Sequence, residues 1–242
     1  MTVVQGTAHD STQDLRIPSY CEVVVNPGLS ISSEIWSILP RHITPTCALD
    51  RVVTEIIQTR RTYEIFRGND LEFSNRPFPS VQSLLNPKDE METQKSPVTS
   101  SIVNNIIQVM TVPTLPEQIA ILFFMGSVIR WLVSPTPANY YSMPEWLRPT
   151  PSQLSCPHPV WIDLFIWPKA RDRMSREPKY HGEIAIMTEV SNASLCVNWP
   201  FPLSDMLSHD NGPEAELVLN PTFERHIRDL KNWSVGPRMF EV

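Results

Sequence analysis

The residues best suited to chemistry lie between residues 130 and 172, where Trp, Pro, Arg, Asp and His are interleaved. His158 and Asp163 are five positions apart, around a predicted short helix that begins at Pro159. A histidine beside a carboxylate can move protons near neutral pH, so this pair is the first candidate for an acid or base. The structural alternative is that His158 caps a turn while Asp163 pairs with an arginine such as Arg171. The sequence leaves both interpretations open.

A second candidate pair, Glu145 and Arg148, flanks Trp146 at a spacing of three residues. A guanidinium can hold the carboxylate or enolate oxygen of a ligand and stabilise negative charge that develops there. The alternative is a local ion pair between Glu145 and Arg148 that fixes the turn.

Aromatic side chains supply candidates for binding an apolar ligand. An indole N–H or a phenol O–H gives each ring one polar group beside a large apolar surface. Ordinary core packing against prolines would use the same residues. We expect several of them to line an apolar pocket: Trp131, Tyr140, Tyr141, Trp146, Trp161, Trp167 and Trp199.

Cofactor and metal motifs are missing from the sequence. It contains seven glycines and no Gly-rich phosphate loop, no G-x-S-x-G elbow and no H-E-x-x-H pair. Cys156 and His158 would join His181 or Cys196 in a metal site only by coincidence of folding, because no zinc-type spacing connects them. The sequence therefore predicts no cofactor and no metal.

The elements that must position these residues are predicted to be helices. Apolar residues recur at helical spacing over residues 47–66 and 97–110, and residues 116–133 are apolar on nearly every side, as in a buried central helix. Many of the 24 prolines follow a cap-type residue, which favours short helices with sharp starts. We expect such helices at 137–142, 144–147, 151–155, 158–165, 168–175 and 221–230. The only β-structure expected is a small hairpin between residues 195–199 and 216–219.

Composition limits the class of protein. The chain has 242 residues, a net charge of −6 and a single basic residue, Arg16, among its first forty, which argues against a DNA-reading surface. We expect an all-α protein with an irregular extension over residues 1–40 and a helical domain over residues 41–242. No signal peptide is evident, and the apolar run at 119–129 is too short to span a bilayer. An intracellular location, cytoplasmic or nuclear, and no membrane partner are therefore expected.

Short motifs in a fixed order also connect the sequence to a known family. They are Leu49-Asp50-Arg51, Leu84-Leu85-Asn86-Pro87, Leu115-Pro116-Glu117-Gln118, Arg130-Trp131, Ser134-Pro135-Thr136-Pro137, Pro144-Glu145-Trp146-Leu147-Arg148-Pro149, Pro157-His158-Pro159, Trp161-Ile162-Asp163, Asn198-Trp199-Pro200, Asn220-Pro221 and Asn232-Trp233. Over residues 49–237 the chain resembles an uncharacterised helical domain that follows the basic leucine zipper (bZIP) in many fungal transcription factors. Neither an arginine-rich run nor sustained leucine heptads appear, so no direct contact with nucleic acid is expected.

Two functions are compatible with these features. In the first, the protein is a cofactor-independent cyclase or isomerase of fungal secondary metabolism. It would fold an apolar natural-product intermediate against the aromatic residues, with His158 or Asp163 moving protons and Arg148 stabilising negative charge. In the second, it is a transcriptional regulator or co-regulator that does not itself bind DNA. It would then sense an effector or bind a protein partner, and that partner includes a second copy of the chain in a homodimer.

Overall fold

The protein is all-α apart from one two-stranded hairpin among the residues that the structure describes. The computed structural model describes residues 34–67, 81, 85, 114–185, 188–189, 194–209 and 217–236. The helix expected at 97–110 lies outside the described residues. The α-helices are α1 (Ala48–Arg67), α6 (Leu115–Val133), α7 (Pro137–Ser142), α8 (Pro151–Ser155), α9 (Pro168–Arg176) and α11 (Pro221–Arg228). The 3-10 helices are η1 (Ile35–Ser37), η2 (Glu145–Leu147), η3 (Val160–Leu164), η4 (Pro178–Tyr180), η5 (Leu203–Met206) and η6 (Leu230–Asn232).

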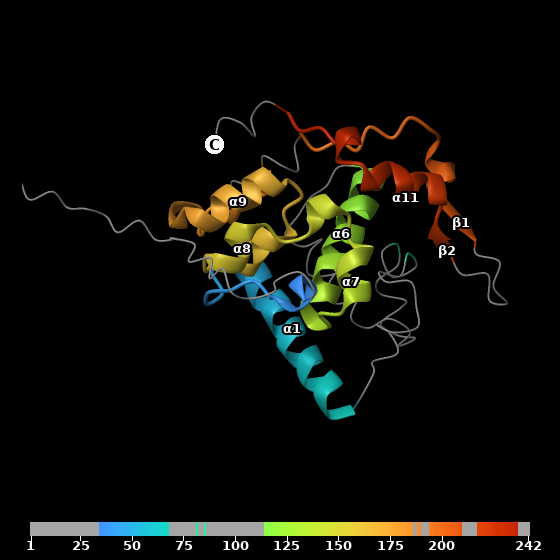
Figure 1. Ribbon diagram of the computed structural model, residues 1–242. Coiled ribbons are helices and arrows are strands. Elements are labelled where there is room, and N and C mark those ends of the chain that lie inside the picture. The colour runs from blue at the N-terminus through green and yellow to red at the C-terminus, as the bar shows by residue number, and fades with distance from the viewer. Residues whose placement is uncertain are drawn as a thin grey trace, which may run out of the picture.

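Helix α6 forms the centre of the core, as its apolar composition predicts. Ile119, Phe124, Ile129 and Leu132 are each at most 1% exposed. Figure 1 shows α6 in the middle of the molecule, with α1 and α7 beside it and α11 across its upper end. By length and composition α6 could cross a membrane, but 83% of its apolar window is buried inside the protein. That degree of burial is typical of the core helix of a globular protein.

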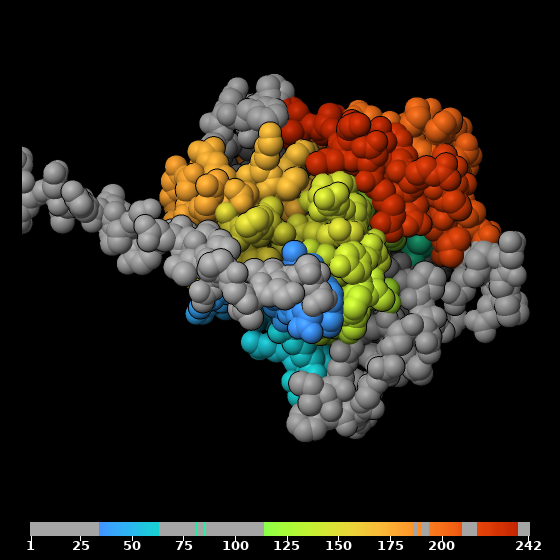
Figure 2. All heavy atoms as spheres, viewed as in Figure 1, coloured from blue at the N-terminus to red at the C-terminus, as the bar shows by residue number. Residues whose placement is uncertain are grey.

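Proline and a capping side chain together set the start of several short helices. Pro137, Pro151 and Pro221 each occupy the first turn, where the missing N–H costs no hydrogen bond. The residue before each proline caps the helix, because its side chain accepts a hydrogen bond from a backbone N–H of the first turn. These capping residues are Thr136, Thr150 and Asn220. The chain therefore turns sharply between elements and wraps α6 closely, with α9 on one side and the C-terminal elements on the other (Figure 2).

The hairpin uses a different strand from the one predicted. Strand β2 (Leu217–Leu219) pairs antiparallel with β1 (Leu207–His209), whereas Cys196 forms an isolated bridge with Ser234. Residues 195–199 cannot continue as a strand because Asn198 adopts a positive φ of 49°. Pro200 and Pro202, which follow, also lack the N–H groups that a ladder needs.

Candidate functional site

His158 and Asp163 come together in the structure as the sequence predicted. The Nε2 atom of His158 lies 2.8 Å from Oδ1 of Asp163, and its Nδ1 atom lies 2.8 Å from the carbonyl oxygen of Cys156. His158 is 0% exposed and Asp163 is 3% exposed. Both groups are held rigidly because Pro159 starts η3, which places Asp163 at its first turn facing back toward His158.

A third and a fourth side chain complete the cluster around Asp163. His42 Nε2 lies 2.5 Å from Asp163 Oδ2, and Gln153 Nε2 donates to Oδ1 at 2.5 Å. Gln153 is fixed in turn by the capping box that it forms with Thr150 at the start of α8. His42 is not predictable as a member of this cluster, because no local spacing relates it to His158. The fold alone brings the two rings together.

The chain around His42 is joined to the same region by backbone hydrogen bonds. His42 and His158 form a parallel bridge, in which Ile43 N donates to His158 O and His158 N donates to Arg41 O, each at 3.0 Å. Asp50 makes the next connection, because its Oδ1 accepts the backbone N–H of Trp161 at 2.8 Å. Residues 41–50 are therefore fastened to residues 158–163 at two points.

The pKa shifts within the cluster favour the charged forms of Asp163 and His158. Burial alone would raise the pKa of Asp163, but the hydrogen bonds from His158 and His42 outweigh it and hold that pKa well below its usual range. Burial opposes the charge on His158, yet the hydrogen bond and the negative charge of Asp163 raise the pKa of the imidazole above its ordinary value. The cluster thus holds a carboxylate against a positively charged partner inside the protein.

The second predicted pair is not formed. The Arg148 guanidinium lies 5.2 Å from the ring centroids of both Tyr140 and Tyr141, rather than against Glu145. The buried cation nearby is Arg171, which donates to the carbonyl oxygens of Leu147, Trp146 and Arg148 at 2.8, 2.5 and 3.3 Å. Arg171 is 0% exposed, and burial lowers its pKa to about 10. It therefore fixes η2 through backbone atoms, and His42, His158 and Gln153 rather than Arg171 make the hydrogen bonds to Asp163.

The predicted aromatic residues fall into separate groups and do not form one wall. Trp131 contacts Tyr140, which contacts Tyr141, with ring centroids 5.8 and 5.3 Å apart. The remaining four rings lie in other contacts. Trp146 packs on Phe124, Trp161 and Trp167 both pack on Phe165, and Trp199 packs on Phe223.

The indole N–H groups of Trp131, Trp146, Trp161 and Trp199 also donate to backbone carbonyl oxygens of the protein. The indole N–H groups of Trp131 and Trp146 donate to the carbonyl oxygens of Trp36 and Arg228, each at 2.8 Å. Trp131 is 1% and Trp161 3% exposed, whereas Tyr141 is 56% exposed. The buried rings therefore serve the core, and Tyr141 presents its ring to solvent.

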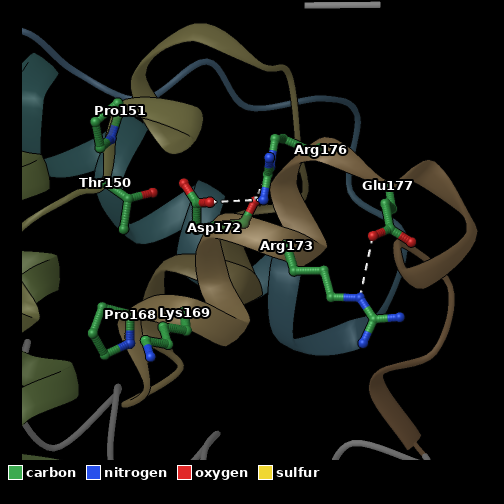
Figure 3. A pocket seen from close by; sticks show the side chains of 8 residues that line it. All are labelled: Thr150, Pro151, Pro168, Lys169, Asp172, Arg173, Arg176 and Glu177. Atoms are coloured by element: carbon green, nitrogen blue, oxygen red, sulfur yellow. Dashed lines mark hydrogen bonds and ion pairs between the residues drawn. The ribbon is translucent and has the colours of Figure 1, made fainter. Parts of the chain in front are cut away.

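A pocket of about 580 Å³ lies between α8 and α9 (Figure 3). Its lining is Thr150, Pro151, Pro168, Lys169, Asp172, Arg173, Arg176 and Glu177, which includes none of the predicted site residues. Two ion pairs cross its surface, Arg176–Asp172 at 3.0 Å and Arg173–Glu177 at 3.1 Å. This hollow is therefore open and bordered by charged side chains, and none of the aromatic residues expected to wall an apolar pocket lines it.

Comparison with known families identifies the central and C-terminal part of the chain. Residues 126–241 match the model of a family described as a domain of unknown function (DUF3425). Over these residues the match agrees with the predicted resemblance to the domain found C-terminal to bZIP in fungal transcription factors, which the sequence analysis gave for residues 49–237. Neither the curated proteins nor the solved structures include a match to the chain.

Proposed function

We propose that this protein is a regulator or co-regulator of transcription related to fungal bZIP factors, and that the described domain acts by binding a protein partner. The match of residues 126–241 to DUF3425 carries this proposal, because that domain lies outside the DNA-reading basic region of those factors. The net charge of −6 is consistent with a partner other than the phosphate backbone. A place inside the cell, in the nucleus when the partner is bound to DNA, follows from this function.

Two features of the described residues support a regulator over a cyclase or isomerase. The predicted proton-moving groups, His158 and Asp163, are buried and have their polar atoms bonded to other parts of the protein. A substrate would have to break these bonds before either group could reach it. Two large apolar side chains at the start of η5, by contrast, face solvent: Phe201 is 52% and Leu203 is 56% exposed. Exposed apolar side chains that lie together suit contact with another protein.

A tethering experiment tests the proposal. The whole chain is fused to a heterologous DNA-binding domain and placed upstream of a reporter gene in a filamentous fungus. We expect the fusion to change transcription several-fold relative to the DNA-binding domain alone. The variant Leu132→Ala, which hollows the core, should lose the effect, whereas Leu115→Ala, at a 39% exposed position of the same helix, should keep it.

A fusion that is folded and nuclear but leaves reporter transcription unchanged would contradict the regulatory proposal. Conversion of a pathway intermediate by the purified protein, lost in His158→Ala and Asp163→Asn, would instead establish the enzyme.

A further inference from the structure

Three groups that commonly bind metals meet at one point, although they come from distant parts of the chain. They are His42 Nε2, His158 Nε2 and the carboxylate of Asp163, and these ligand atoms all lie within 4.8 Å of one another. His158 and Asp163 are buried, while the side chain of His42 is 23% exposed and borders solvent. Two imidazoles and one carboxylate form a ligand set that zinc prefers, and the exposed edge of His42 provides an entry path.

The two contacts of the His158 ring require either a proton or a metal ion between its Nε2 atom and Asp163. Its Nδ1 atom faces the Cys156 carbonyl oxygen, which can only accept, so Nδ1 carries a proton. Its Nε2 atom faces a carboxylate oxygen, which also only accepts. A proton or a metal ion must therefore bridge Nε2 and Asp163. With the proton already fixed on Nδ1, the ring is in the tautomer that binds metals through Nε2.

The second ring is oriented in the same way toward the carboxylate. His42 Nε2 faces Oδ2 of Asp163, while His158 Nε2 faces Oδ1. The two ring centroids are 5.6 Å apart and the rings are inclined at 84°. Two imidazoles on one tetrahedral zinc ion place their ring centres about 5 Å apart, because each Zn–N bond is about 2.0 Å. Small movements of the side chains would therefore admit the ion.

The surroundings resemble the outer contacts that orient metal ligands. The Cys156 carbonyl holds the far nitrogen of His158, and Gln153 Nε2 holds one carboxylate oxygen of Asp163. Contacts of this kind fix the tautomer and the direction of the ligands. The backbone bridge between residues 41–43 and His158 places His42 opposite the other two ligands without relying on its side chain.

We propose that His42, His158 and Asp163 bind one Zn²⁺ ion, with water at the fourth position on the exposed side of His42. On binding, the proton on His158 Nε2 passes to solvent, so that ring changes from an imidazolium to a neutral imidazole with its proton on Nδ1. The proton through which His42 Nε2 contacts Asp163 also leaves that atom, so each ring binds the ion through a bare Nε2. The ion ties residues 41–50 to the segment that contains η3. This inference does not rest on the regulatory function, since such a tie can serve an enzyme or a binding domain equally.

The test uses the full chain after treatment with EDTA. Zinc sulfate is titrated in competition with a chromogenic chelator, and the metal content is measured after gel filtration. We expect about one Zn²⁺ per chain, and a loss of affinity of at least about 100-fold in His42→Ala. His42→Asp should recover part of that loss because it restores a ligand. His226→Gln is the matched control, since this partly buried ring binds the Val197 carbonyl away from the cluster, and it should bind zinc like the parent protein.

Circular dichroism shows whether His42→Ala keeps its helices, and the backbone bridge beside it makes retention the expected result. The proposal is overturned if the folded parent chain retains no zinc, or if His42→Ala and His226→Gln bind it equally. NMR of the imidazole nitrogens gives an independent reading. A proton that stays on Nε2 of His158 in excess zinc would identify the cluster as a hydrogen-bond network only.

Discussion

Asp50 and Trp161 are linked by a buried hydrogen bond although 111 positions separate them. The other carboxylate oxygen of Asp50 accepts the backbone N–H and the hydroxyl of Thr46, at 2.9 and 2.7 Å. The Asp50 carboxylate thus holds Thr46, just before α1, and connects the first turn of that helix to η3. Asp50 is 0% exposed, so its three donors have no water to replace the carboxylate.

Replacing this carboxylate by an amide gives the first prediction. In Asp50→Asn the NH₂ group must face an N–H or hydroxyl donor, which leaves a buried donor without an acceptor. We expect the free energy of unfolding to fall by about 2–3 kcal/mol, measured by urea denaturation. Glu55→Gln, at an exposed position of the same helix, should change stability little. An Asp50→Asn variant as stable as the parent would show that the hydrogen bond to Trp161 contributes nothing.

Arg171 leads to the second prediction. Its guanidinium is the shared donor for the carbonyl oxygens of residues 146, 147 and 148. In Arg171→Met the aliphatic volume is largely kept, but these buried acceptors lose their partner. We expect a loss of about 3 kcal/mol in unfolding free energy, read from the urea midpoint. Arg173→Met, on the same helix with a 54% exposed side chain, is the control and should stay close to the parent.

Much of the helical architecture follows from local signals. Apolar periodicity predicted a helix over 47–66 and a core helix over 116–133, and the structure has α1 at Ala48–Arg67 and α6 at Leu115–Val133. The cap-proline pairs predicted the starts of α7 and α8 because both the cap and the fixed φ of proline act within a few residues.

Features that depend on distant parts of the chain were not predictable. The proximity of His158 and Asp163 follows from a five-residue spacing, but His42 joins them through a bridge that no local pattern encodes. The strand partner of Leu217–Leu219 was wrong for the same reason, since several short segments are equally suited to pair and the positive φ at Asn198 decides between them. The functional roles of the predicted site residues stay predictions.

The third prediction concerns the capping box of α8, which also supports Gln153 beside Asp163. Thr150 Oγ1 accepts the Gln153 N–H at 3.3 Å, and Gln153 Oε1 accepts the Thr150 N–H at 2.9 Å. Thr150→Ala should lower the unfolding free energy by about 1 kcal/mol. Thr150→Ser, which keeps the hydroxyl, should restore most of it. Equal stability of the alanine and serine variants would show that the cap is not needed.

The last prediction concerns the thiol of Cys47, which lies where residues 41–50 enter α1. Burial raises the pKa of this thiol above its ordinary value of 9.0, and the negative charge of Asp50 adds to the shift. The folded state therefore holds the proton more tightly than the unfolded chain. Its contribution to stability is complete below the ordinary pKa and is lost as pH rises through the folded value.

Alkylation by iodoacetamide, followed by mass spectrometry of the Cys47 peptide, should show a rate midpoint above 9.0 in the native protein and a faster reaction at pH 8 in urea. A native midpoint at or below 9.0 would mean that the thiol is open to solvent and that the start of α1 is less tightly packed than the structure shows.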